Sequence, residues 1–169
     1  VEKHVKTSEL EKKARELLEE RGVKIEDIAE LVYYLQASYH QELTMEECRF
    51  NVNRVLAKRE VQNAVITGIQ LDILAEKKLL DEPLLETIVT DESLYGVDEI
   101  IALSIVNVYG SIGLTNYGYI DKQKPGILKS LNDKSSGKVN TFLDDIVGAI
   151  AAAASSRLAH STVDNEIKD

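Results

Sequence analysis

An uncharged stretch near the C-terminus constrains the fold of this chain more than any other feature. Residues 146–156, with the sequence IVGAIAAAASS, carry no charge on any face of the helix that their alanines favour. A helix that is apolar all round is buried all round, and this run is too short to span a bilayer. We therefore predict a long helix over Val139–His160 at the centre of a bundle.

The remaining chain supplies amphipathic helices that can surround this central helix. Apolar residues recur three or four positions apart, without strand-like alternation. A capping box of Thr44 and Glu47 opens the helix that follows it. Helices are predicted over Ser8–Glu20, Ile25–His40, Met45–Leu56, Arg59–Lys77, Pro83–Val89, Asp98–Tyr109 and Leu114–Gln123, with loops at Asp91–Gly96 and Asn132–Gly137. The expected fold class is all-α: a single-domain helical bundle of residues 1–169, in which residues 161–169 form a frayed tail.

The uncharged residues 100–120 need a separate test, because this stretch is long enough to cross a membrane. Its interior contains Asn107, Gly110, Ser111 and Asn116, and such a polar, glycine-broken centre is unlike a lipid-facing span. We therefore predict two buried helical pieces in place of a membrane span.

Charge and cysteine usage exclude several classes of function. The net charge is −9, whereas nucleic-acid binding needs a basic surface, so nucleic acid is not expected as a partner. Cys48 is the only cysteine, which excludes an internal disulfide and suits a reducing cytosol, and we predict that it is buried. The chain is charged from Glu2 onward, which is unlike a secretory signal, so a cytoplasmic location is expected.

Two acidic pairs stand at the starts of the two helices that lack charges further along. Asp144 and Asp145 precede residues 146–156, and Asp98 and Glu99 begin the other such helix. Buried carboxylates repel one another and are poorly solvated, and a divalent cation resolves both problems. Oxygen ligands of this kind suit Mg²⁺. The alternative is that Asp144 and Asp145 are first-turn acids that interact favourably with the helix dipole.

A basic segment follows Asp121, which ends the uncharged stretch and is a further acidic candidate. The lysines of this segment are Lys122, Lys124, Lys129, Lys134 and Lys138, opposed only by Asp133. In a chain of negative net charge, this local excess indicates either a solvated lysine-rich loop or an anion site in which lysine binds phosphate.

Three sequence blocks occur in an order that resembles a known family. They are VDEII at Val97–Ile101, DKQKPGIL at Asp121–Leu128, and GKVNTFLDDIVGA at Gly137–Ala149. The chain resembles the magnesium-dependent phosphatidylglycerophosphatase A family in these blocks. Its first 96 residues are charged and amphipathic, without the apolar spans of the membrane-embedded members. It therefore looks like a soluble branch of that family, close to the bacterial low-temperature-requirement C proteins.

The resemblance implies Mg²⁺-dependent hydrolysis of a phosphomonoester, the removal of phosphate from phosphatidylglycerophosphate. By match, the site would consist of Asp98, Glu99, Asp121, Lys124, Asp144 and Asp145. We expect Asp98, Asp144 and Asp145 to bind the metal, Glu99 or Asp121 to orient or deprotonate the attacking water, and Lys124 to neutralise charge on the phosphate. The local excess of lysine adds Lys129 and Lys134 to Lys124 as candidates for phosphate or headgroup binding. The implied partner is a phosphorylated small molecule or a lipid headgroup.

Two other functions stay open at this point. The first is a non-catalytic helical binding or regulatory protein that has kept the acidic pairs. The second is an all-α nucleotide pyrophosphohydrolase, which needs glutamates paired along a helix. Glu46 and Glu47 lack an acidic partner at Phe50 or Asn51, which disfavours this reading.

The lysines of residues 122–138 also suggest how the chain could meet a lipid. They reverse the sign of the overall charge locally, and each lysine near an anionic surface contributes about 1 kcal/mol. We therefore expect a peripheral contact with the inner face of an anionic membrane. Both a monomer and a homo-oligomer are compatible with the sequence.

Overall fold

The structure, a computed structural model, describes the backbone of residues 7–166 and the side chains of residues 9–160. Its α-helices are α1 (Thr7–Glu20), α2 (Ile25–Gln36), α3 (Met45–Leu56), α4 (Arg59–Glu76), α5 (Leu84–Thr90), α6 (Val97–Val106), α7 (Ser111–Gln123), α8 (Ile127–Leu131) and α9 (Leu143–Glu166). Two short 3-10 helices, η1 (Asn107–Tyr109) and η2 (Lys134–Ser136), complete the secondary structure. The described chain contains no strand, which confirms the all-α prediction.

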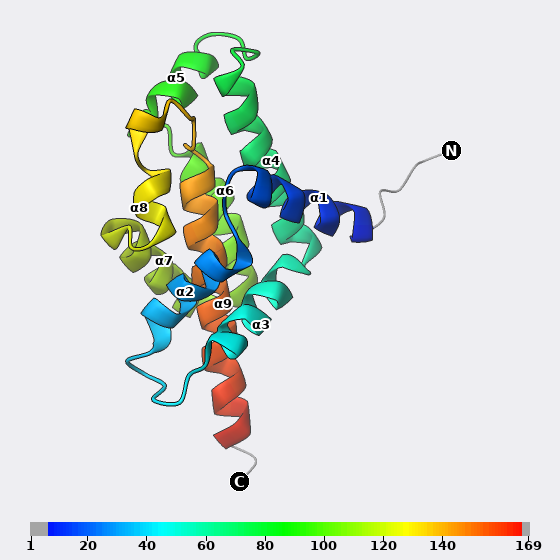
Figure 1. Cartoon of the computed structure of the whole chain (residues 1–169), viewed down its shortest axis with the longest axis vertical. Helices are drawn as coiled ribbons and strands as arrows, with labels where there is room; N and C mark the ends of the chain where they lie inside the picture. The colour runs from blue at the N-terminus through cyan, green and yellow to red at the C-terminus, as the bar shows by residue number, and fades with distance from the viewer. Residues whose placement is uncertain (1–6, 167–169) are drawn as a thin grey trace.

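Helix α9 forms the axis of the bundle, as the uncharged stretch predicts (Figure 1). It packs against α2, α3, α4, α6, α7 and α8. Residues 149–156 are buried on every side of the helix. Gly68 lets α4 approach α9 closely. A Cβ atom at this position would lie 3.1 Å from Cβ of Phe142 and would overlap the Ile146 side chain. Small residues therefore set how tightly the surrounding helices can pack.

Both ends of α9 differ from the prediction. The helix begins at Leu143, several residues after the predicted start at Val139. It continues to Glu166, whereas a frayed tail was expected from residue 161, and residues 167–169 lie outside the described part of the chain.

The start of α9 is fixed by a side chain from another helix. Asp72 on α4 is fully buried, and its carboxylate accepts hydrogen bonds from the backbone N–H groups of Phe142 (3.0 Å) and Leu143 (2.9 Å). These are first-turn groups that have no partner within their own helix. Burial raises the pKa of Asp72 to about 8, although the two backbone N–H groups act in the opposite direction. Asp72 is therefore the N-terminal cap of α9, supplied from a distant part of the sequence.

Replacing Asp72 with alanine is expected to lower the free energy of unfolding by about 2–4 kcal/mol, because two buried N–H groups lose their acceptor. Asp72→Asn keeps one acceptor oxygen and should lose less. Urea unfolding of both variants measures the difference. Equal stability of the alanine variant and the wild type would contradict the capping role.

Two local predictions are confirmed. The Thr44 hydroxyl accepts from the Glu47 backbone N–H, and the Glu47 carboxylate accepts from the Thr44 N–H, which is the expected capping box. Cys48 is fully buried, and burial raises its pKa to about 11, which makes the thiol unreactive at neutral pH.

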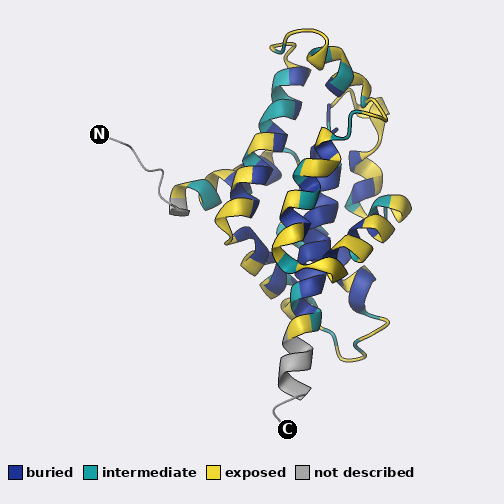
Figure 2. Ribbon diagram, turned by 180° about the vertical axis from the view of Figure 1, so that it is seen from behind, coloured by how far each residue is buried: buried dark blue, intermediate teal, exposed yellow. Residues whose placement is uncertain are grey.

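The prediction that both pieces of residues 100–120 are buried is wrong for their outer faces. Helices α6 and α7 pack one face against α9, and on the other face Ile100, Ile112 and Leu114 are exposed. Figure 2 shows that exposed and buried residues alternate along the surrounding helices. Within the described residues, no helix is long and apolar enough to cross a membrane.

Candidate active site

The acidic pairs predicted from the sequence meet at one open cavity of ≈ 320 Å³. It lies where the first turns of α6 and α9 meet the C-terminal end of α7, with the loop after α5 and the start of η2 closing its edge. Its lining residues are Asp91, Glu92, Ser93, Gly96, Asp98, Glu99, Asp121, Lys124, Asn132, Lys134, Asp144 and Asp145. The cavity therefore gathers residues from all three of the family-like blocks.

Helix ends position the charged groups. Asp98 and Asp144 lie in the first turns of α6 and α9, where the partial positive charge of a helix N-terminus favours carboxylates. Lys124 is the C-terminal cap of α7 and has a left-handed backbone with φ of 46° and ψ of 49°. Pro125 follows and cannot continue the helix, so the chain turns here and holds Lys124 toward the start of α9.

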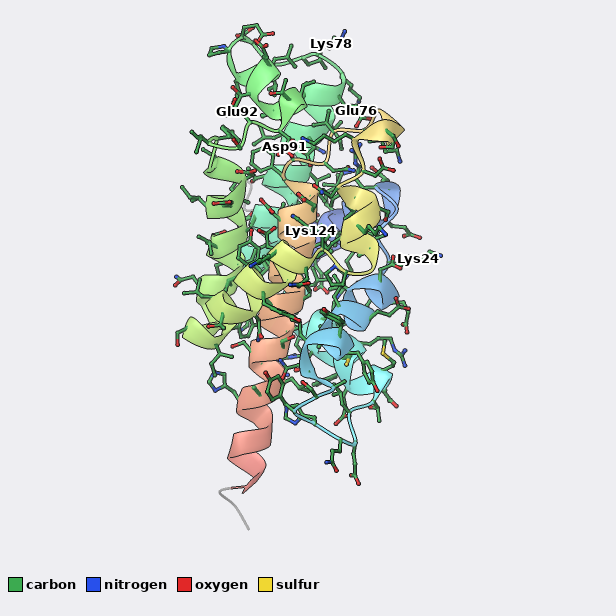
Figure 3. All side chains as sticks on the ribbon, turned by 90° about the vertical axis from the view of Figure 1, so that its left-hand side faces the viewer. Lys24, Glu76, Lys78, Asp91, Glu92 and Lys124 are labelled. Carbon is green, nitrogen blue, oxygen red and sulfur yellow. The ribbon has the colours of Figure 1, made fainter. Side chains whose placement is uncertain are left out.

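The Lys124 ammonium group lies among three carboxylates, on the side of the molecule shown in Figure 3. Its Nζ is 2.6 Å from Oδ1 of Asp121, 2.8 Å from Oδ2 of Asp144 and 3.8 Å from Oδ1 of Asp145. Burial lowers the pKa of Lys124, but Asp144 and Asp121 outweigh it and raise that pKa above its ordinary value. Lys124 therefore stays charged and balances part of the acidic cluster.

The remaining carboxylates are poorly compensated. Burial, followed by repulsion from Asp144, raises the pKa of Asp145 to about 8. Burial also raises the pKa of Asp98, whose side chain is only 8% exposed and whose Oδ1 atom has no hydrogen-bond partner. Asp98 and Asp145 are buried, and the Asp144 side chain is 12% exposed. Among the described residues, Lys124 is the cation that pairs with Asp144 and Asp145, so further positive charge would stabilise this site.

The donor set fits a hard divalent cation. All the candidate ligands are carboxylate oxygens, the type that Mg²⁺ prefers. Asp98 lines the cavity, and its buried Oδ1 atom has no hydrogen-bond partner. The side chains are not arranged as a finished ligand set, however, since no three His, Cys, Asp or Glu residues in the described range lie close enough to share an ion. Asp144 is turned toward Lys124 instead.

The structure separates the lysines that the sequence grouped together. Lys124 and Lys134 line the cavity, whereas Lys129 is exposed on α8 and is not among the lining residues. Nζ of Lys134 is 3.3 Å from Oδ2 of Asp91. An adjoining cavity of ≈ 240 Å³ shares Asp91, Asn132, Lys134 and Asp144 with the first and adds Lys138, Asn140 and Thr141.

Sequence reasoning missed Asp91 and Glu92, which line the cavity from the loop after α5. Asp91 caps α5 with a left-handed backbone, φ 54°, so the chain reverses here and brings the loop to the site. The available signal is an acidic loop only a few residues before the Asp98–Glu99 pair.

The raised pKa values predict how the stability of the metal-free protein depends on pH. Because the pKa values of Asp72 and Asp145 are raised to about 8, the folded state binds more protons than the unfolded chain above about pH 4. The free energy of unfolding should therefore decrease as the pH rises from about 5 to about 8. Urea unfolding in EDTA across this range measures the slope, and added Mg²⁺ should flatten it. A stability that increases over this range would contradict the assignment.

Comparison with known proteins gives consistent matches over most of the chain. The sequence profile of the family described as Phosphatidylglycerophosphatase A matches residues 19–160. The uncharacterized protein YutG of Bacillus subtilis (strain 168) is 71% identical over 153 residues, which cover 90% of this chain and 92% of that protein. The solved structure of the low temperature requirement C protein from Listeria monocytogenes is 68% identical, with a TM-score of 0.91, and covers 94% of this chain and 99% of that one. A protein of unknown function from Bacillus stearothermophilus is 78% identical, with a TM-score of 0.89 and coverage of 90% and 94%.

Proposed function

This chain belongs to the phosphatidylglycerophosphatase A family, and from that premise we propose that it is a Mg²⁺-dependent phosphomonoester hydrolase acting on phosphatidylglycerophosphate. The observation that carries the proposal is the single cavity lined by Asp98, Glu99, Asp121, Lys124, Asp144 and Asp145. Family membership suggests phosphatase chemistry. The six side chains that line this cavity form the candidate active site for that reaction.

Asp98, Asp144 and Asp145 would hold the metal ion, because they are the buried or nearly buried carboxylates in the first turns of α6 and α9. When bound, Mg²⁺ supplies a Lewis acid that neutralises charge on the phosphoryl oxygens. The Lys124 ammonium group adds a fixed positive charge within reach of the same oxygens. Asp121 positions Lys124 through its ion pair of 2.6 Å.

Glu99 is the better placed of the two candidates for orienting the attacking water. The carboxylate of Asp121 is committed to Lys124, whereas Glu99 is exposed at the mouth of the cavity. The water oxygen attacks phosphorus, and the bond from phosphorus to the glycerol oxygen breaks. The water gives up a proton, and the leaving oxygen takes up a proton and becomes a hydroxyl group. The products are inorganic phosphate and phosphatidylglycerol.

The adjoining cavity offers room for the rest of the headgroup. Lys134 forms part of the wall common to both cavities, so it can contact a second phosphate while the first lies beside Lys124. Lys129 is not among the residues that line either cavity, so we do not assign it a phosphate-binding role.

Phosphate release from phosphatidylglycerophosphate in detergent micelles tests the proposal, with Mg²⁺ and with EDTA. We expect release that requires the metal and is slower in Glu99→Gln. Mg²⁺ binding without release would favour the non-catalytic alternative. Pyrophosphate release from nucleoside triphosphates would favour the pyrophosphohydrolase, for which α3 is poorly suited because Glu47 caps that helix.

A further inference from the structure

Tyr117 on α7 carries a buried hydroxyl group that has no hydrogen-bond partner among the described residues. The residue is 7% exposed, so bulk water does not replace the missing partner. Buried tyrosine hydroxyls usually find a partner, because an unpaired polar group is costly away from water. The hydroxyl therefore needs an acceptor that its present neighbours do not supply.

The position of the Tyr117 ring on α9 places this hydroxyl close to the candidate active site. Helix α7 packs against α9 (Figure 1), and the Tyr117 ring lies against Gly148. A Cβ atom at Gly148 would lie 3.8 Å from Cε2 of Tyr117, the ring atom next to the carbon that bears the hydroxyl. Gly148 follows Asp144 and Asp145 by one helical turn and shares a face of α9 with them. The Tyr117 ring therefore packs on the face of α9 that carries the two aspartates.

The charges that act on the Tyr117 hydroxyl come from the candidate active site. Asp145 has the largest effect among them, followed by Asp121, Glu99 and Asp144. Burial, and then these negative charges, raises the pKa of Tyr117 above its ordinary value, so the hydroxyl keeps its proton. Tyr117 therefore offers a neutral hydrogen-bond donor to a group of acceptors.

Asp145 lacks the kind of partner that Tyr117 offers. Within the described part of the chain, its carboxylate accepts no hydrogen bond, and its ion pair with Lys124 is long, at 3.8 Å. Carboxylates that bind a metal ion are themselves usually held by a hydrogen bond from an outer residue. Asp145 is therefore an acceptor without a donor, and Tyr117 is a donor without an acceptor on the same face of α9.

We propose that Tyr117 is a positioning residue of the metal site, whose hydroxyl donates a hydrogen bond to the Asp145 carboxylate and holds it in place as a ligand. The inference rests on the Mg²⁺ site of the proposed function and adds a residue from outside the cavity lining. A cation bound by the aspartates competes with Lys124, which frees the Asp145 carboxylate from its 3.8 Å contact. Tyr117 then donates to the Asp145 oxygen that does not bind the ion.

Tyr109 provides a matched control for this role. Its hydroxyl is also buried and without a partner among the described residues, but the charge with the largest effect on it is Arg157. The Tyr109 carbonyl accepts from the Ser156 hydroxyl (3.0 Å), which lies roughly 16 Å further along α9 than Asp145 at about 1.5 Å per residue. A change to phenylalanine removes the same atom at either tyrosine, so only the surroundings of that atom differ.

The test compares Tyr117→Phe, Tyr109→Phe and the wild type in calorimetric titrations with Mg²⁺ alone. The Mg²⁺ affinity of Tyr117→Phe should fall about tenfold to a hundredfold, the usual effect of losing the outer partner of a metal ligand, whereas Tyr109→Phe should bind as the wild type does. In EDTA, both variants should unfold at the wild-type temperature or at a higher one, because each loses an unpaired buried hydroxyl and keeps its ring. A crystal grown with Mn²⁺ should place Oη of Tyr117 about 3 Å from a carboxylate oxygen of Asp145.

Four outcomes would overturn the positioning role. They are wild-type Mg²⁺ affinity in Tyr117→Phe, an equal loss of affinity in Tyr109→Phe, a marked loss of metal-free stability in Tyr117→Phe, and a Tyr117 hydroxyl more than about 4 Å from Asp145 in the Mn²⁺ crystal. The third outcome would mean that the hydroxyl has a structural role in the absence of metal.

Failure of this inference can be told apart from failure of the proposed function. If Tyr117→Phe weakens Mg²⁺ binding but the wild type releases no phosphate from phosphatidylglycerophosphate, the proposed function fails and the positioning role stands. If the wild type releases phosphate and both variants bind Mg²⁺ as it does, the positioning role fails and the function stands. Absence of Mg²⁺ binding by the wild type would overturn both.

Discussion

Asp145→Asn is expected to lower phosphate release by more than about a hundredfold, because it removes a proposed metal ligand, and even the loss of a residue that only supports a ligand costs up to about a hundredfold. The metal-free variant should unfold at the same temperature as the wild type or at a higher one. Burial raises the pKa of Asp145 to about 8, so a neutral amide of the same shape suits the apo site better than a carboxylate does. Thermal melts in EDTA and phosphate-release assays in Mg²⁺ measure the two effects.

Asp144→Asn is the matched variant and should lose activity to the same extent. The Asp144 carboxylate makes an ion pair of 2.8 Å with Lys124 and accepts a hydrogen bond from the Asp145 N–H. The variant relieves the repulsion between Asp144 and Asp145 but loses the ion pair with Lys124, and the two effects offset each other. Lys124 keeps Asp121 as a partner, and the net change in stability should stay within about 1 kcal/mol. A large loss of apo stability in both variants would mean that the two acids are structural caps.

Lys124→Met is expected to have the opposite effect on the metal-free protein. The variant leaves Asp121, Asp144 and Asp145 without their ammonium partner. Because Lys124 is 25% and Asp121 is 37% exposed, the expected loss is about 1–2 kcal/mol, below the cost of breaking a fully buried pair. The same carboxylates should then bind Mg²⁺ more tightly in the absence of substrate, because the ion no longer competes with an internal cation. Phosphate release should nevertheless fall by about a hundredfold, since the ammonium group that neutralises negative charge on the transferred phosphate is lost.

Lys129→Met is the control, because Lys129 is exposed and outside the cavity lining. Calorimetric titration with Mg²⁺ and thermal melts in EDTA should leave it unchanged. If Lys124→Met behaves like this control in both measurements, Lys124 does not balance the acidic cluster.

The sequence predicted the centre of the fold and the convergence of the two acidic pairs for the same physical reason. A charge-free helix has no solvent-facing side, so residues 146–156 had to lie on the bundle axis. Acids at the start of such a helix are carried inward with it. Asp98 and Asp144 therefore meet at one cavity although they are far apart in the sequence.

Other features depend on contacts that periodicity does not encode. The cap supplied by Asp72 joins α4 to α9, and in the sequence Asp72 looks like any polar residue on an amphipathic helix. The role of Asp91 depends on a left-handed turn that folds its loop over the site. The sequence predicts that the outer face of α6 is buried, whereas Ile100 on that face is exposed. Hydropathy shows how apolar a helix is, but it does not show how many of its faces have neighbours.

A crystal of the protein grown with Mn²⁺ and measured at the manganese absorption edge tests the central claim most directly. We expect one anomalous peak inside the ≈ 320 Å³ cavity, bounded by the carboxylates of Asp98, Asp144 and Asp145, with Lys124 turned away from Asp144. Data from a crystal of Asp145→Asn should show the peak weakened or lost. No peak in the cavity at millimolar Mn²⁺, with Lys124 still paired to Asp144, would contradict a metal-dependent site.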